Sequence, residues 1–246
     1  MRSIYDQEMR EIQRDSIHMC NLAAETLQDV MDAVRRRDFN VVDRVLEQDY
    51  TLRQMRMAIN ERVMRMIATQ HPVAVDLRKL FYLVHTADEM ERIGYQAAGI
   101  GRAMMREQYG KVPLLDDIFR MSERVGTMLE RVLTCSLGED AEGMKAVLRM
   151  DDEVDVICEQ IYRECIARQG AHQVQDSETM TAISIAQYLE HVGDHAVNWA
   201  RWWLYFNGGP GETSDVIVKA SRNGKDAIMR PTFALWGRYG GRGGAR

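Results

Sequence analysis

Four acidic residues in the second half of the chain have a spacing that could bind a metal ion. Asp151 and Asp155 are one helical turn apart in one periodic segment. Glu190 and Asp194 are one turn apart in the last such segment. Carboxylates that face each other across packed helices raise each other's pKa unless a cation lies between them. We therefore predict a metal site made of these four side chains, with iron, manganese, zinc or magnesium all suited to oxygen ligands.

The chain is an internal duplication, and part of this pattern occurs in its first half. The segment 91–97 returns 99 positions later as 190–196, which places Glu91 over Glu190. Asp49 matches Asp151 at an offset of 102. We therefore include Asp49 and Glu91 as metal-ligand candidates in the first half.

The first half departs from the second at two of the four positions. Arg53 stands where the second half has Asp155, and Tyr95 stands where it has Asp194. An arginine here can neutralise Asp49 or Glu91 directly, so that an ion pair replaces a metal. We predict an asymmetric protein whose better metal site lies in the second half.

Other potential ligands are interpreted differently. His191 and His195 have the i, i+4 spacing that suits zinc, but they point about 100° away from the neighbouring acids on a helix. We interpret them as surface or capping histidines. Cys158 and Cys165 lie on one helical face and are interpreted as buried core residues, since free cysteine is commonly buried.

Enzyme signatures are missing from the sequence. It has no Glu-x-x-His pair, no His-Glu-x-x-His, no Gly-x-Ser-x-Gly and no dinucleotide fingerprint, so we predict a protein without catalytic activity. Two alternatives remain open. The carboxylates could form a carboxylate-bridged metalloenzyme or metal store, or they could form ion pairs in a purely structural helical module.

Helical periodicity dominates the sequence and strand patterns are scarce, so we predict an all-α fold. Two three-helix bundles related by a pseudo-two-fold axis explain the repeat most simply. The expected domains are 1–111 and 112–208, followed by a disordered Gly/Arg-rich tail at 209–246. The apolar stripes predict six helices: 12–34, 41–66, 74–107, 118–138, 140–169 and 177–206.

Composition limits the cellular setting and the class of partner. Net charge is −5, and residues 208–246 carry seven basic and three acidic groups, so residues 1–207 hold an excess of nine acidic groups. Such a body argues against nucleic-acid binding. The absence of Cys-x-x-Cys and the charged N-terminal segment indicate the cytoplasm. No apolar run approaches the roughly 20 residues that cross a bilayer, so any membrane contact would pass through a protein partner.

Three segments resemble the PhoU family: 68–78 (ATQHPVAVDLR), 90–94 (MERIG) and 188–198 (YLEHVGDHAVN). The resemblance extends over roughly residues 5–207. It implies two three-helix bundles whose acid-x-x-x-Asp motifs bind multinuclear iron or other metal clusters. Glu190 with Asp194 is the intact motif, whereas Tyr95 breaks the first one and His191 replaces the usual arginine of the second.

The resemblance also implies a role in phosphate regulation. PhoU-like proteins act with the phosphate-specific ABC transporter and a sensor histidine kinase to keep phosphate-starvation genes off when phosphate is plentiful. The expected partners are the transporter's PstB-like ATPase and a PhoR-like kinase, with a homodimer as the expected assembly. We therefore expect a non-catalytic, metal-binding adaptor at the inner face of the membrane, held there by its partners.

Overall fold

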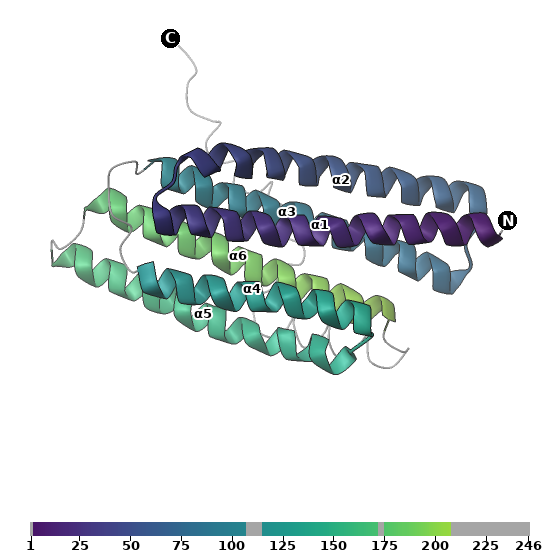
Figure 1. Cartoon of the computed structure of the whole chain (residues 1–246). Helices are drawn as coiled ribbons and strands as arrows, with labels where there is room; N and C mark the ends of the chain where they lie inside the picture. The colour runs from purple at the N-terminus through teal and green to yellow at the C-terminus, as the bar shows by residue number, and fades with distance from the viewer. Residues whose placement is uncertain (1, 107–114, 172–174, 208–246) are drawn as a thin grey trace, which may run out of the picture. The chain divides into compact units, whose positions relative to one another are not determined.

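A computed structural model describes residues 2–106, 115–171 and 175–207, and these residues form six long helices and no strand (Figure 1). The predicted all-α fold is confirmed, and each expected helix is present. The helices are α1 (Arg2–Arg36), α2 (Asn40–Gln70), α3 (Ala74–Arg106), α4 (Leu115–Gly138), α5 (Ala141–Gly170) and α6 (Asp176–Asn207).

Two predicted helix ends need correction. Gly138 was expected to stop its helix, but it is the last helical residue and Glu139 adopts the left-handed conformation with φ 53°. Ser177 was expected to cap α6, but the helix begins at Asp176, and a Glu178 carboxylate oxygen accepts a hydrogen bond from the Gln175 N–H at 3.2 Å. Both errors are one residue in size, because short-range capping contacts decide the final turn.

Each half forms its own bundle, with α1, α2 and α3 packed together in one and α4, α5 and α6 in the other. The two bundles meet along α3 and α6, which lie antiparallel at the centre of the molecule (Figure 1). Tyr82 near the start of α3 contacts Trp199 near the end of α6, and Gly99 packs on Tyr188 in the opposite sense. The 99-residue offset pairs each residue of α3 with one of α6. The predicted pseudo-two-fold axis therefore passes between the middles of these two helices.

The helices from residue 2 to residue 207 form one compact unit. The structure therefore does not separate the two repeats into independent domains, and the proposed boundary near residue 112 stays a prediction. The predicted tail at 209–246 lies outside the described residues. Among the helices of the described chain, none combines the length and apolar character that crossing a membrane requires.

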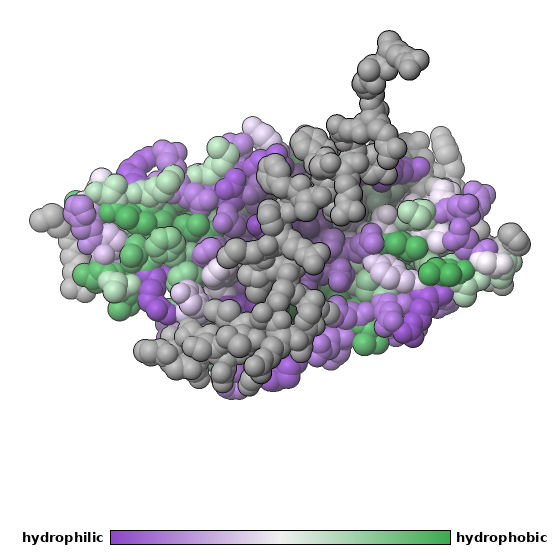
Figure 2. All heavy atoms as spheres, turned by 180° about the vertical axis from the view of Figure 1, so that it is seen from behind, coloured by the Kyte–Doolittle hydropathy of each residue, from purple (hydrophilic) through white to green (hydrophobic). Residues whose placement is uncertain are grey.

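The core is made of the apolar stripes that the sequence predicted. All four cysteines are free and buried, which confirms the interpretation of Cys158 and Cys165 as core residues. Apolar residues also lie on the surface, and in Figure 2 they gather toward the end where α2 passes into α3. Met64, Val73 and Val75 are exposed there.

Candidate functional site

The helices α5 and α6 bring three of the four predicted second-half acids together. Gly193 of α6 faces α5, where a Cβ would make an ordinary van der Waals contact 3.5 Å from an Asp151 carboxylate oxygen. Glu190 and Asp194 lie on either side of Gly193 along α6, one turn apart. The structure therefore positions Asp151 from α5 opposite a pair of acids from α6.

These acids raise one another's pKa. Burial is the main cause at Asp194, and the negative charges of Asp151 and Glu190 add to it, raising the pKa of Asp194 to about 6. The pKa of Glu190 is likewise raised by burial first and then by Asp151. A bound cation would reverse both effects, because it replaces water as the group that stabilises the negative charge.

Asp155 lies one turn beyond Asp151 on α5 and is half-buried. It is not among the groups that shift the pKa of Glu190 or Asp194. Within the part of the chain that the structure describes, no three acidic, histidine or cysteine side chains already converge closely enough to hold an ion. The cluster has the carboxylate oxygens that a cation needs, but the side chains would have to rotate before they could bind one ion together.

The equivalent acids of the first repeat are neutralised by arginine. Arg53 lies 3.6 Å from an Asp49 carboxylate oxygen and 3.5 Å from a Glu91 carboxylate oxygen. Arg56 pairs with Glu91 and lies 3.7 Å from Asp88. The prediction that Arg53 would neutralise one of these acids is confirmed, since it contacts both.

Asp49 is the buried acid of this first cluster. Burial raises its pKa, while the charges of Arg53 and Arg102 lower it. Its Oδ1 atom has no hydrogen-bond partner among the described residues. Tyr95, which replaces the acid of the second repeat, is exposed, and the Arg102 guanidinium lies 5.2 Å from its ring centre. Two arginines thus lower the pKa of the buried acid of the first repeat, and one of them, Arg53, stands where the second repeat has Asp155.

The interpretation of His195 as a surface or capping residue is wrong. Its side chain is only 12% exposed, and its Nδ1 atom donates a hydrogen bond of 2.8 Å to Glu89, which is 8% exposed. This contact joins α6 to α3 and therefore links the two repeats. Glu89 lies between Thr86 and Ile93 on the buried face of α3. That position within the helical period was the sequence signal that Glu89 is buried. His191 is half-exposed, as expected.

The segment that carried the family resemblance also has a structural role. Arg78 donates hydrogen bonds to the main-chain oxygens of Tyr205 and Phe206, near the end of α6. Nearby, the His85 ring stacks on Trp202 with a centroid distance of 3.8 Å. Sequence reasoning used this segment only for its resemblance, because the carbonyls that Arg78 binds are 127 and 128 residues away.

Comparison with known proteins finds one family domain twice in the chain. The family model described as "PhoU domain" matches residues 17–104 and again residues 118–203, within the first and second bundles respectively. The chain belongs to the PhoU family. A curated relative from Clostridium acetobutylicum, named "Phosphate-specific transport system accessory protein PhoU homolog", is 26% identical over 85% of this chain and 96% of its own length.

Other similar proteins agree with this assignment. The PhoU accessory protein of Escherichia coli is 29% identical over 83% of this PhoU-family chain and 86% of its own length. The crystal structure of PhoU from Pseudomonas aeruginosa matches with a TM-score of 0.78 at 24% identity, covering 82% of this chain and 98% of that one. A Streptococcus pneumoniae structure titled "phosphate transport system regulatory protein PhoU" has the same TM-score at 20% identity. These structures show the fold.

Proposed function

We propose that this chain is an accessory protein of phosphate-specific transport that keeps the phosphate-starvation response off when phosphate is plentiful. The observation that carries the proposal is the match of the PhoU domain to both bundles, at 17–104 and 118–203. The relatives named as accessory proteins align over nearly all of the described helices. Their names describe an accessory protein and not an enzyme, which supports a role without turnover.

The proposed mechanism is that of an adaptor. Long helices packed on a shared α3–α6 centre give stiff outer faces that can dock on other proteins. The proposed partners are the ATPase of the phosphate ABC transporter and a sensor histidine kinase. An adaptor that binds one kinase conformation more tightly than the other shifts the kinase toward that conformation. Association with the membrane would then pass through these partners, and a homodimer stays a prediction.

We propose a metal ion as the neutralising group of the second repeat. Asp151, Glu190 and Asp194 would hold it, with Asp155 one turn away as a further ligand. The support is the raised pKa of Glu190 and Asp194, to which burial contributes most and the charge of Asp151 adds. The ion would supply positive charge and fix α5 against α6, as Arg53 does for α2 and α3. Iron, manganese, zinc and magnesium are all candidates.

The adaptor proposal is tested by association in the host cell. Full-length chain carrying an affinity tag is recovered from cells grown in high and low phosphate, and the transporter ATPase and the kinase are quantified by immunoblot. Both should be recovered, with an amount that depends on phosphate, and deletion of the gene should switch on a phosphate-starvation reporter in high phosphate. Failure to recover either partner at any phosphate level, with a silent reporter, would reject the proposal.

The metal proposal has a separate test. Protein purified without chelator is analysed for bound metals, and the expected content is one or a few ions per chain. Uptake of many ions per chain, or turnover with iron and oxygen, would instead indicate the metal store or metalloenzyme. Absence of any bound metal would favour the purely structural role of these acids.

A further inference from the structure

A groove runs between α1 and α4, the two helices that lie nearest the viewer in Figure 1. The two helices are antiparallel: Gln13 of α1 lies near Ser136 of α4, and Arg35 lies near Phe119. Three adjoining cavities make up the groove. The first two share Cys20, Leu133 and Trp199, and the second and third share Ala24, Gln28, Leu129 and Glu130.

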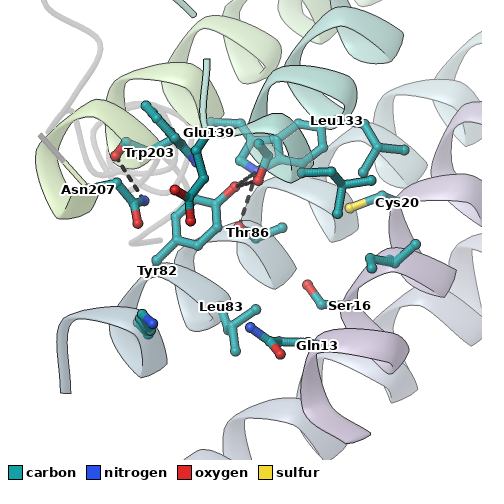
Figure 3. Close-up of a pocket in the computed structure, with 15 residues that line it drawn as sticks. Gln13, Ser16, Cys20, Tyr82, Leu83, Thr86, Leu133, Glu139, Trp203 and Asn207 are labelled. Atoms are coloured by element: carbon teal, nitrogen blue, oxygen red, sulfur yellow. Dashed lines mark hydrogen bonds between the residues drawn. The ribbon is translucent and has the colours of Figure 1, made fainter. Parts of the chain in front are cut away.

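The floor of the groove is apolar, and its partly exposed members are Ile17, Phe119 and Leu133. The widest of the three cavities, at the Arg35 end, has a volume of about 460 Å³ and lies above the buried Leu27 and Leu129. Gly126 stands beside them, and a Cβ at this position would meet nothing within 4 Å. Figure 3 shows the end of the groove away from Arg35, where Cys20 and Leu133 lie together and Gln13 and Ser16 lie near Leu83.

The rim of the two cavities nearest Arg35 carries acids that differ from three other acids of α1. Glu11 and Asp15 both pair with Arg62, and Asp29 pairs with Arg44. The acids of the groove form no ion pair with any described residue. These rim acids are Glu25, Asp32, Glu123 and Glu130.

One cation already shows what the groove can bind. The Arg35 guanidinium lies over the Phe119 ring, 4.1 Å from its centre, at one end of the groove. A basic side chain can therefore use both the acidic rim and the apolar floor, since its aliphatic part packs on apolar surface while its charge stays near carboxylates.

We propose that the α1–α4 groove binds an amphipathic helix of a partner protein, with an apolar ridge on the floor and lysines or arginines against the rim acids. The stretch from Gln13 to Arg35 spans roughly 33 Å at 1.5 Å per residue, which matches a helix of about six turns. A second copy of this chain fits poorly, because two such grooves would bring eight like charges together. The inference goes beyond the proposed function, since it depends neither on metal nor on the identity of the transport partners.

The test uses two designed peptides of 22 residues and the full-length chain. Both carry leucines at i, i+3, i+4 and i+7, and their remaining positions are lysine in one peptide and glutamate in the other. Fluorescence anisotropy measures the binding of each. The lysine peptide should bind at least tenfold more tightly. Gly126→Trp adds a bulky side chain where a Cβ meets nothing within 4 Å, and it should weaken that binding at least tenfold.

Matched variants distinguish binding at the groove from attraction to the overall negative charge of the protein. Glu123→Lys with Glu130→Lys should weaken the lysine peptide at least tenfold, whereas Glu159→Lys with Glu164→Lys on α5 makes the same charge change and should leave it within twofold. Gly170→Trp, also in open space, is the control for Gly126→Trp. Thermal melting shows that each variant is folded.

Three outcomes would overturn the proposal. The lysine peptide fails to bind the unmodified chain, or the α5 controls weaken its binding as much as the groove variants do. In the third outcome, sedimentation shows a dimer of the chain that Gly126→Trp dissociates, which would assign the groove to a second copy.

Discussion

The two repeats share a helical fold but differ in the charges that surround their equivalent acids. In the first repeat, Arg53 contacts both Asp49 and Glu91, so the protein supplies the positive charge itself. In the second repeat, Asp194 keeps a pKa of about 6 because its nearest strong influences are burial and other acids. A duplicated fold thus preserves helix packing while a few substitutions change the charges around equivalent acids.

The helices that join the repeats have diverged in the same way. Glu89 of α3 pairs with His195 of α6, but the repeat offset assigns Tyr188 and Gln96 to the symmetry-related positions. Trp199 donates hydrogen bonds to Tyr82 and Thr86, and its counterpart in α3 is Ile100, which has no polar group. One side of the pseudo-two-fold axis is therefore held by polar contacts that the other side lacks.

The largest expected difference between the repeats is in metal affinity. Asp151→Asn with Asp194→Asn should weaken binding of Mn²⁺ or Zn²⁺ about a hundredfold or more, because carboxylate ligands supply most of the attraction for such ions. Asp49→Asn with Glu91→Gln should leave the affinity within about twofold. Isothermal titration calorimetry on metal-free protein measures both, and equal losses in the two double variants would contradict the asymmetry.

The contact between the repeats should make the next largest difference. Glu89→Leu should lower the free energy of unfolding by about 2 kcal/mol, because it removes a buried carboxylate and leaves His195 without its partner. Glu89→Gln keeps an acceptor oxygen and should cost less than about 1 kcal/mol. Urea unfolding compares them, and an equal loss in both variants would show that this hydrogen bond contributes little.

Removing the arginine of the first repeat should have a smaller effect. Arg53→Met should lower the free energy of unfolding by about 1 kcal/mol, a value reduced from that of a buried ion pair because Arg53 is 47% exposed. Asp155→Asn, at the equivalent position of the second repeat, should not destabilise metal-free protein. Unfolding in the presence of EDTA measures both variants. A stable Arg53→Met protein that gains a second metal ion would strengthen the comparison further.

The smallest expected effect is on the pH dependence of stability. Because the pKa of Asp194 is raised to about 6, the folded protein binds this proton more tightly than the unfolded chain does. Metal-free protein should therefore lose about 1 kcal/mol of unfolding free energy as pH rises from 5 to 7.5, after allowance for solvent screening. Asp194→Asn should flatten this part of the profile. A profile unchanged by Asp194→Asn would contradict the raised pKa.

The sequence predicted the six helices well because apolar periodicity extends over many residues in each of them. It also predicted that Asp151, Glu190 and Asp194 would lie near one another, since their spacing places acids on facing sides of helices that had to pack. It could not predict the Glu89–His195 hydrogen bond, which depends on how α3 and α6 are rotated against each other. Likewise, nothing local indicates that Arg78 binds the carbonyls at the end of α6.

The most direct test of the asymmetry between the repeats is anomalous X-ray diffraction from crystals of the full-length chain grown with Mn²⁺ or Zn²⁺. We predict an ion between α5 and α6, bound by carboxylates of Asp151, Glu190 and Asp194, and no ion beside Asp49 and Glu91. An ion in the first repeat with none in the second, or no ion at either position, would contradict the account.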